Sequence, residues 1–439
     1  MLNVPLPEAF VASIVQDSPF GIPLIEALDH SASTSIRFNT RKPSVVAFED
    51  LEPVPWCPNA FYLKERPNFT LDPLFHAGVY YPQEAASMAI YDLVKSLQLP
   101  EGSVVLDACA APGGKTLAMM DALPENCAGI ANEIHPHRAN ILCENVTKWG
   151  LDHVAVCNND TSMFRDLEAF FDLVLIDAPC SGEGMFRKDP NARLEWSLDA
   201  VQKCSERQSV IVNNLINSIK TGGYLIYATC TFNQSENEQQ IQEILATGKF
   251  EVQPWSAPSD SLHGRNGIGH YFVPGRSRSE GLFIAVLKKK GSSESQSVTL
   301  SPSPKKSFAG LDINTLPHQE IVQQQKLAHL RSKSLGSALL RLKIPLRFLK
   351  IGIAVGESTM KGWVPLHDLA MTSCNLTGIE CSKQEALMYL RGETFPIPPY
   401  PPSYYLIRYQ GVNLGFIKHL GQRFNNLYPK PWRIRMHLK

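Results

Sequence analysis

Short apolar segments and amphipathic stretches alternate through the middle of the chain. Five segments are rich in β-branched and other apolar residues and end at a polar position; in chain order they read SVVLDACA, CAGIANEI, HVAVCNND, FDLVLIDAP and GYLIYATC. The stretches between them have the spacing of apolar residues that is typical of helices. This alternation predicts an α/β fold with an open, mostly parallel sheet that helices cover on both faces.

Polar side chains follow the five predicted strands at the point where each strand ends. In chain order they are Asp107, Glu133, Asp160, Asp177 and Cys230. Because ligands of open α/β sheets bind outside the carboxyl ends of the strands, we expect these side chains to line one crevice. A second thiol, Cys180, lies in a Pro-Cys-Ser-Gly turn just beyond Asp177. If the two strands concerned are neighbours, both thiols face that crevice.

A glycine-rich turn follows the first predicted strand, in the sequence DACAAPGGKT. Its Pro-Gly-Gly lets the backbone approach a ligand, and the N–H groups at the helix start are free to receive a carboxylate. Cys109 stands where a phosphate-binding loop needs its first glycine, so the turn is not a P-loop. Glu133, at the next strand end, suits hydrogen bonding to ribose hydroxyls. These groups favour S-adenosylmethionine, a nucleoside that carries an amino acid, over a generic nucleotide.

Charge is unevenly distributed along a chain whose formal net charge is zero. Residues 81–200 contain 18 Asp and Glu against 8 Lys and Arg, whereas residues 401–439 contain 4 Arg and 3 Lys and no acid. Seven aromatic residues are interleaved with these bases: Tyr404, Tyr405, Tyr409, Phe416, Phe424, Tyr428 and Trp432. The pattern favours contact with a nucleic acid, and the alternative is a small β domain with an aromatic core. The two interpretations are compatible.

The ten cysteines include no C-x-x-C pair, which argues against a zinc ribbon or a disulfide framework. His135 and His137 have no Cys or His cluster at ligand spacing, so we expect no metal site. No apolar run approaches the roughly 18 residues of a membrane span, and the N-terminal segment lacks the pattern of a secretory signal. We therefore expect a cytoplasmic protein with reduced thiols and no membrane partner.

Five segments together resemble the motif set of the RNA cytosine-5 methyltransferases, the family that includes the Sun proteins. They read YYPQEAASM, DACAAPGGKT, DAPCSGEG, RKDP and YATCTFNQSENE, and the resemblance spans about residues 35–288. A polar, Ser-rich linker follows. Beyond it, LKIGIAVGESTMKGWVPLHDLAM and YQGVNLGFIKHLGQRFNNLYPK resemble the C-terminal parts of the RsmF-type bacterial enzymes, which methylate small-subunit ribosomal RNA and end in a PUA-like RNA-binding module.

The resemblance implies a Rossmann-like S-adenosylmethionine-dependent methyltransferase domain. A small N-terminal α+β domain precedes it, and a mostly β, PUA-like RNA-binding region ends the chain. The predicted boundaries are 1–80 for an N-terminal domain of RNA-binding type, 81–290 for the catalytic methyltransferase domain, 291–308 for the linker, 309–385 for an intermediate RsmF-type domain and 386–439 for the PUA-like RNA-binding domain.

The resemblance also implies the cofactor, the partner and the site. S-adenosylmethionine is the expected cofactor, and RNA, namely 16S ribosomal RNA or the small ribosomal subunit, is the expected partner. Cys230 corresponds to the nucleophile that attacks C6 of cytosine, Cys180 to the residue that assists product release, and Asp177 to a group at the base edge. The candidate cofactor-binding residues are Cys109, Ala110, Ala111, Pro112, Gly113, Gly114, Lys115, Glu133, Arg138, Asp160 and Asp177. The alternatives are a cytosine-5 methyltransferase of transfer RNA or DNA, and a non-catalytic RNA-binding factor of ribosome assembly.

Overall fold

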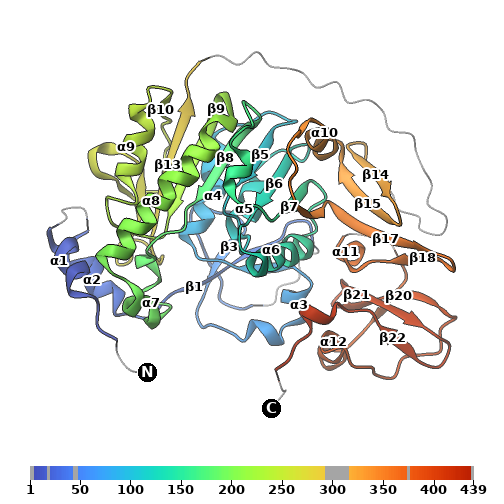
Figure 1. The fold of residues 1–439 in the computed structure, drawn as a ribbon. Helices are drawn as coiled ribbons and strands as arrows, with labels where there is room; N and C mark the ends of the chain where they lie inside the picture. The colour runs from blue at the N-terminus through green and yellow to red at the C-terminus, as the bar shows by residue number, and fades with distance from the viewer. Residues whose placement is uncertain (1–3, 17–19, 43–47, 292–315, 373–375, 437–439) are drawn as a thin grey trace.

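The computed structural model describes residues 4–16, 20–42, 48–291, 316–372 and 376–436. These residues form one large sheet and three four-stranded sheets (Figure 1). One small sheet precedes the large sheet in the chain and two follow it. No helix in the described ranges is long and apolar enough to cross a membrane.

The central sheet confirms the predicted α/β fold. Its five parallel strands lie in the order β7-β6-β5-β8-β9 and coincide with the five apolar segments. Their bounds are Val104–Asp107 (β5), Ala128–Asn132 (β6), Val154–Cys157 (β7), Phe171–Asp177 (β8) and Ile219–Thr229 (β9). Antiparallel strands extend the sheet beyond β9, namely β13 (Leu282–Lys289), β12 (His270–Phe272), β11 (Leu262–His263) and, paired with β13, β10 (Phe250–Val252).

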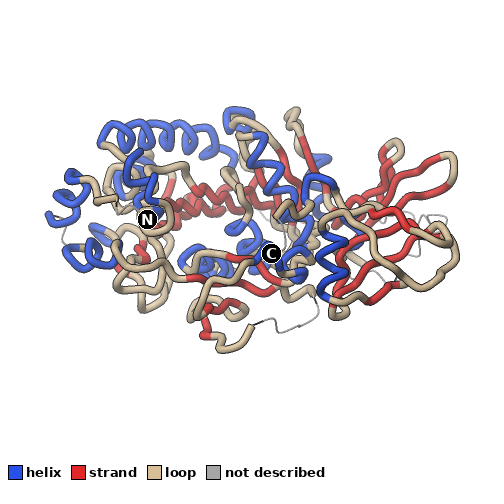
Figure 2. The backbone as a smooth tube through the Cα atoms, turned by 90° about the horizontal axis from the view of Figure 1, so that it is seen from below, coloured by secondary structure: helices blue, strands red, loops and turns tan. Residues whose placement is uncertain are grey.

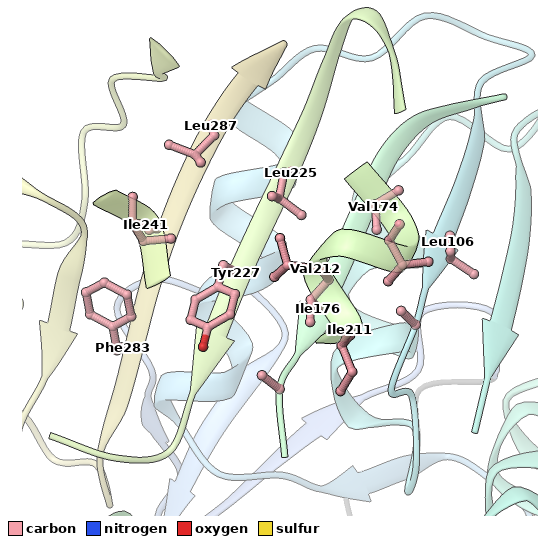
Figure 3. Close-up of a cluster of buried hydrophobic side chains, with 14 of the residues drawn as sticks. Leu106, Val174, Ile176, Ile211, Val212, Leu225, Tyr227, Ile241, Phe283 and Leu287 are labelled. Carbon is pink, nitrogen blue, oxygen red and sulfur yellow. The ribbon is translucent and has the colours of Figure 1, made fainter. Parts of the chain in front are cut away.

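Helices cover both faces of this sheet (Figure 2). Successive strand residues point to opposite faces, so Val105 packs toward one group of helices and Leu106 toward the other. The first group is α4 (Ala89–Ser96), α5 (Gly114–Ala122) and α6 (Pro136–Trp149). The second is α8 (Leu198–Leu215), α9 (Glu238–Ala246) and α10 (Lys333–Arg341). Figure 3 shows the second core, where side chains of β5, β8, β9 and β13 lie beside Ile211 and Val212 of α8.

The N-terminal part of the chain comprises two helices, which pack against the central sheet, and a small sheet. Helices α1 (Glu8–Gln16) and α2 (Gly21–Leu28) join the core on the α8 face, where the rings of Phe10 and Phe186 lie 5.1 Å apart. The small sheet has the order β2-β3-β1-β4, with bounds Glu52–Pro53, Ala60–Leu63, Thr34–Phe38 and Tyr80–Pro82, and α3 spans Pro73–His76. The predicted boundary after Tyr80 falls within β4, so one strand of this sheet leads directly into the segment that contains the central sheet.

The C-terminal part is also anchored on the central sheet (Figure 1). Strand β16 (Phe348–Ile351) pairs antiparallel with β7 and thus becomes the edge strand of that sheet. One small sheet contains β14 (Gln319–Gln324), β15 (Leu327–Ser332), β17 (Ile353–Thr359) and β18 (Gly362–Pro365), followed by α11 (His367–Ala370). The other contains β19 (Gly378–Glu380), β20 (Ser403–Tyr409), β21 (Val412–His419) and β22 (Phe424–Asn426), with α12 (Lys383–Leu390). Residues 292–308 of the predicted linker lie outside the described residues.

The aromatic residues of the basic tail divide between core and surface. Four are buried, namely Tyr405, Phe416, Phe424 and Tyr428, and three are partly exposed, namely Tyr404, Tyr409 and Trp432. The bases Arg423, Lys430 and Arg435 are exposed. The core interpretation therefore holds for four of the seven aromatic residues, and the exposed bases remain available to a polyanion.

Candidate active site

The five predicted strand-end side chains lie along the carboxyl edge of the central sheet. Strands β5 and β8 end at Asp107 and Asp177, Glu133 and Cys230 come directly after β6 and β9, and Asp160 follows β7. Strand β5 is flanked by β6 on one side and β8 on the other. The strand order reverses at this point, which is where a ligand of an open α/β sheet binds.

The glycine-rich turn connects β5 to α5 and is held from the neighbouring strand and helix. The N–H of Ala110 donates to the carbonyl of Asn132 at 2.8 Å, and Nη2 of Arg138 donates to the carbonyl of Ala111 at 2.6 Å. Gly113 precedes α5 with φ of +117°, a conformation that L side chains rarely adopt. The N–H groups of the first turn of α5 lack helical acceptors, so they are available to an anionic ligand group.

Two acids are fixed at the ends of β6 and β7. Glu133 is buried, accepts a hydrogen bond from the N–H of His135 at 2.9 Å, and has its other oxygen 3.4 Å from Nη1 of Arg138. Asp160 is exposed, and the hydrogen bonds that it accepts from Ser162 lower its pKa. Arg138 therefore contacts both Glu133 and the glycine-rich turn, and so links the two predicted cofactor elements.

Asp107 is fully buried beneath the turn. Its Oδ2 accepts a hydrogen bond from Oγ1 of Thr116 at 2.6 Å, whereas its Oδ1 has no partner among the described residues. Burial raises the pKa of Asp107 to about 7, the nearby charge of Asp177 acts in the same direction, and the Thr116 hydrogen bond opposes both. Because its side chain is wholly covered, Asp107 supports the turn from beneath through Thr116.

The raised pKa of Asp107 predicts a loss of stability as pH rises. Because the folded-state pKa of about 7 lies above the ordinary 3.8, the unfolded chain releases this proton first. The free energy of unfolding therefore falls between these pH values, by at most about 4 kcal/mol at roughly 1.4 kcal/mol per pH unit. Asp107→Asn is expected to remove this part of the pH dependence in urea unfolding without cofactor. Asp166→Asn, at an exposed position, is the control. Equal slopes of the free energy of unfolding against pH for wild type and Asp107→Asn would contradict the prediction.

The two predicted catalytic thiols lie side by side. Strands β8 and β9 are adjacent and parallel, with Asp177 opposite Ala228, so the turn after β8 meets the end of β9. The Sγ atoms of Cys180 and Cys230 are 3.2 Å apart, and the N–H of Cys230 donates to Sγ of Cys180 at 3.4 Å. Both side chains are partly exposed.

This contact makes the two thiols chemically unequal. The hydrogen bond from Cys180 lowers the pKa of Cys230, and the charge of Lys115 adds to that effect against burial and the charge of Asp177. The same hydrogen bond raises the pKa of Cys180, and burial raises it further. The contact itself allows either thiol to donate, and the opposite directions of the two pKa shifts predict that Cys230 ionises before Cys180. Because the thiolate is the nucleophilic form of cysteine, this order agrees with the predicted role of Cys230 as the nucleophile.

Lys115 connects the cofactor turn to the thiol pair. Its Nζ lies 2.9 Å from Oδ2 of Asp177, and both side chains are largely buried. The charge of Asp177 and its hydrogen bond raise the pKa of Lys115 against the effect of burial, so this lysine stays charged. The ion pair uses one carboxylate oxygen of Asp177. No described side chain other than Lys115 donates a hydrogen bond to this carboxylate.

A buried polar network beneath the thiols was missed by the sequence analysis. Glu236 is fully buried and accepts hydrogen bonds from the N–H of Ser181 at 2.9 Å, from Gln208 at 2.8 Å and from Asn233 at 2.6 Å. Glu183 accepts from the N–H of Phe232 at 2.6 Å and from Trp196 and Asn233. These bonds join the turn after β8 to the segment after β9 and so hold the two thiols in register. Both acids stand in the motifs already quoted, but their burial depends on the fold.

No described group of three or more His, Cys, Asp or Glu side chains is arranged to hold a metal ion. The nine cysteines in the described ranges are free.

Comparison with known proteins identifies the family. Three family models match in succession: the N-terminal domain of 16S rRNA methyltransferase RsmF over residues 6–85, 16S rRNA methyltransferase RsmB/F over 94–288, and the methyltransferase RsmF PUA domain over 377–434. A relative from Vibrio cholerae, named ribosomal RNA small subunit methyltransferase F, is 31% identical over 98% of this chain and 98% of its own. One of the same name from Shewanella sediminis is 30% identical over 97% and 96%. The crystal structure of a methyltransferase homologue from Pyrococcus horikoshii has a TM-score of 0.56 at 26% identity, and covers 66% of this chain and 97% of that one.

The sheet order, the turn after β5 and these matches define the class as the S-adenosylmethionine-dependent methyltransferases. The matches on either side of the methyltransferase domain, to the N-terminal and PUA domains of RsmF, narrow the class to the RsmF type. The chain belongs to the family of ribosomal RNA small subunit methyltransferase F. The predicted family, fold class and cofactor are confirmed, whereas the domain boundaries and the roles of individual residues stay predictions.

Proposed function

We propose that this protein methylates carbon 5 of a cytosine in 16S ribosomal RNA, in the cytoplasm. The observation that carries this proposal is the thiol pair, with Cys180 and Cys230 3.2 Å apart beside the cofactor crevice. The relatives' name, which specifies small-subunit ribosomal RNA, supports the substrate. The free thiols of the described cysteines support a reducing compartment.

The crevice suits S-adenosylmethionine, which when bound supplies an electrophilic methyl group on a sulfonium. The turn from Cys109 to Gly114 and the start of α5 offer N–H groups to its carboxylate. Asp107, which is fully buried, supports this turn from beneath through the hydrogen bond that it accepts from Thr116. Glu133 and Asp160 are acceptors for its ribose hydroxyls and base, with Arg138 holding Glu133 in position.

Cys230 acts as the nucleophile at C6 of the cytosine. Carbon 5 of a cytosine ring is a poor nucleophile, and attack of a thiolate at C6 converts the ring into an enamine that is reactive at C5. Covalent catalysis thus replaces one difficult step by two easier steps. The hydrogen bond from Cys180 and the charge of Lys115 favour the thiolate of Cys230 at neutral pH. Asp177, with one oxygen on Lys115, directs the other to the N3 and N4 edge of the base.

Cys180 acts after methyl transfer. The C5 proton must then leave before the C6–S bond breaks, and a base is needed near Cys230. The hydrogen bond to Cys230 and its charge are among the causes that raise the pKa of Cys180 in the resting enzyme. Formation of the C–S bond removes the negative charge on Cys230. The pKa of Cys180 therefore falls in the adduct, and the same thiol changes from a donor into a base, directly or through water.

Methyl transfer to defined nucleic acids tests the proposed function. The wild-type protein is incubated with methyl-labelled S-adenosylmethionine and with 16S ribosomal RNA, small ribosomal subunits, transfer RNA or DNA, and the products are digested to nucleosides. We expect label in 5-methylcytosine from 16S ribosomal RNA, free or in the subunit, and none from the other substrates. Label in transfer RNA or DNA alone would replace 16S ribosomal RNA as the assigned substrate. RNA binding without any label would support a non-catalytic assembly factor.

A further inference from the structure

A basic cavity lies where the N-terminal part of the chain meets the catalytic domain. It encloses about 590 Å³ and is lined by the segment from α2 to β1, the residues after β3, the turn 275–278 and one side chain of the active-site loop. Among its described lining residues, five are cationic and none is a carboxylate; the cations are Lys64, Arg66, Arg187, Arg276 and Arg278. Ser31 adds a hydroxyl group, whereas the hydroxyl groups of Ser33 and Ser277 already form hydrogen bonds with Glu280 and with Val273 and Ser279, respectively. The cavity is therefore suited to an anion.

Two of the five cations have carboxylate partners. Arg187 is largely covered, with its Nε 2.7 Å from Oε2 of Glu280, and it also donates to the carbonyl of Ser279. Arg278 pairs with Glu52. The other three are exposed and form no ion pair with any described residue, namely Lys64, Arg66 and Arg276. About three positive charges are thus left for a ligand.

The cavity and the thiol pair share one loop. Arg187 lies on the segment that follows Cys180, and Gly184 of that segment donates its N–H to the carbonyl of Cys230 at 2.8 Å. A Cβ atom at Gly184 would lie 3.0 Å from that carbonyl oxygen and 3.1 Å from the carbonyl oxygen of Glu280. The carboxylate of Glu280 also forms the ion pair with Arg187, which lines the cavity. The segment that supplies Arg187 to the cavity is therefore in backbone contact with Cys230 and with Glu280.

We propose that this cavity binds a backbone phosphate of the RNA strand next to the cytosine held at Cys230, with Arg276 as its main contact and Arg66 and Lys64 beside it. This inference rests on the proposed function. A cytosine that reacts at C5 and C6 must be unstacked, so its flanking backbone needs an anchor outside the base pocket. Guanidinium groups suit that task because their planar N–H donors match phosphate oxygens. The catalytic segment 81–200 is strongly acidic, so the strand needs such a basic site close to the reacting base.

Salt-dependent RNA binding tests this proposal. The Kd of an RNA fragment that the wild type methylates is measured at several KCl concentrations for wild type and Arg276→Gln. We expect about a 10-fold weaker Kd at low salt and a slope of log Kd against log salt that is smaller by about 0.7, the value for one contact to a single strand. Lys64→Gln is expected to act in the same direction. Arg207→Gln, an exposed arginine of α8 without an ion pair to a described residue, is the matched control and leaves both quantities unchanged.

A neutral backbone linkage locates the contact. Methylphosphonate is introduced at single linkages around the target cytosine, and the Kd is measured with wild type and Arg276→Gln. We expect one flanking linkage at which loss of charge weakens wild-type binding but not binding by Arg276→Gln. Equal losses for both proteins at every linkage would overturn the proposal.

Two further outcomes separate the hypotheses. If wild type methylates the RNA but Arg276→Gln binds it with unchanged Kd and salt slope, the cavity inference fails and the proposed function stands. If the wild type methylates no RNA at all, the proposed function fails. Inorganic phosphate serves as a probe for a free-anion site. Phosphate that binds wild type but not Arg276→Gln, and that RNA does not displace, would assign the cavity to a small anion and overturn the proposal.

Discussion

Replacement of Cys180 by alanine is expected to stop the reaction at a covalent protein–RNA adduct that already carries the new methyl group. The Cys180 thiol is 3.2 Å from Cys230, so it is the side chain positioned to accept the C5 proton once the methyl group is in place. Without that base the C6–S bond cannot break. Turnover should fall by about 10² to 10⁴-fold, the usual contribution of a positioned acid or base. A denaturing gel with labelled methyl groups should show about one label per protein chain, retained on an RNA-linked band.

The Cys180 variant should also form its adduct more slowly at neutral pH. The hydrogen bond from Cys180 lowers the pKa of Cys230, so its loss moves thiolate formation to higher pH. The rate of adduct formation in a single turnover should therefore rise with pH over a higher range than in the wild type. Cys204→Ser, at a partly exposed thiol of α8, is the control and should turn over normally without an adduct. An adduct-free, fully active Cys180→Ala would contradict the assigned role.

Replacement of Cys230 by alanine is expected to abolish both methyl transfer and adduct formation. The proposed reaction passes through a bond between this sulfur and C6, and no other described thiol shows a lowered pKa. Activity should fall by roughly 10⁴ to 10⁶-fold, the loss typical of removing a covalent nucleophile. RNA binding should persist, because phosphate contacts dominate the affinity of proteins for nucleic acids. Methyl incorporation into 16S ribosomal RNA and the gel assay together measure this result.

The variant Cys230→Ser separates the loss of the thiol from the loss of side-chain volume. Cys230→Ser keeps the size of the side chain but replaces the thiol by a hydroxyl, which does not ionise near neutral pH, so it should be as inactive as the alanine variant. If Cys230→Ala still forms an adduct and Cys180→Ala does not, the two thiols have the opposite assignment, with Cys180 as the nucleophile. Loss of RNA binding by both Cys230 variants would indicate a structural defect in place of a chemical one.

The strand ends were predictable from the sequence because the patterns that define them are local. A buried parallel strand is a short apolar run, and its carboxyl end is the first polar residue after it, so Asp107 and Asp177 could be assigned without a structure. The turn before α5 was predictable for the same reason, since Gly113 meets a backbone requirement set by its immediate neighbours. Strand β16 was not predictable, because its position at the edge of the central sheet depends on pairing with β7, far away in the chain.

The sequence by itself determined the α/β class, the set of strand-end side chains and the resemblance that named the two thiols. Only the tertiary structure sets the opposite directions in which the pKa values of the two thiols shift. That property depends on the 3.2 Å contact between Cys180 and Cys230, on Lys115 from the first turn, and on the buried Glu236 that holds the loops together. It likewise decided that four of the aromatic residues of the basic tail are core and that a basic cavity adjoins the active-site loop. The physical reason is that burial, charge interactions and proton affinity depend on distances between residues remote in sequence, whereas strand and helix patterns depend on neighbours along the chain.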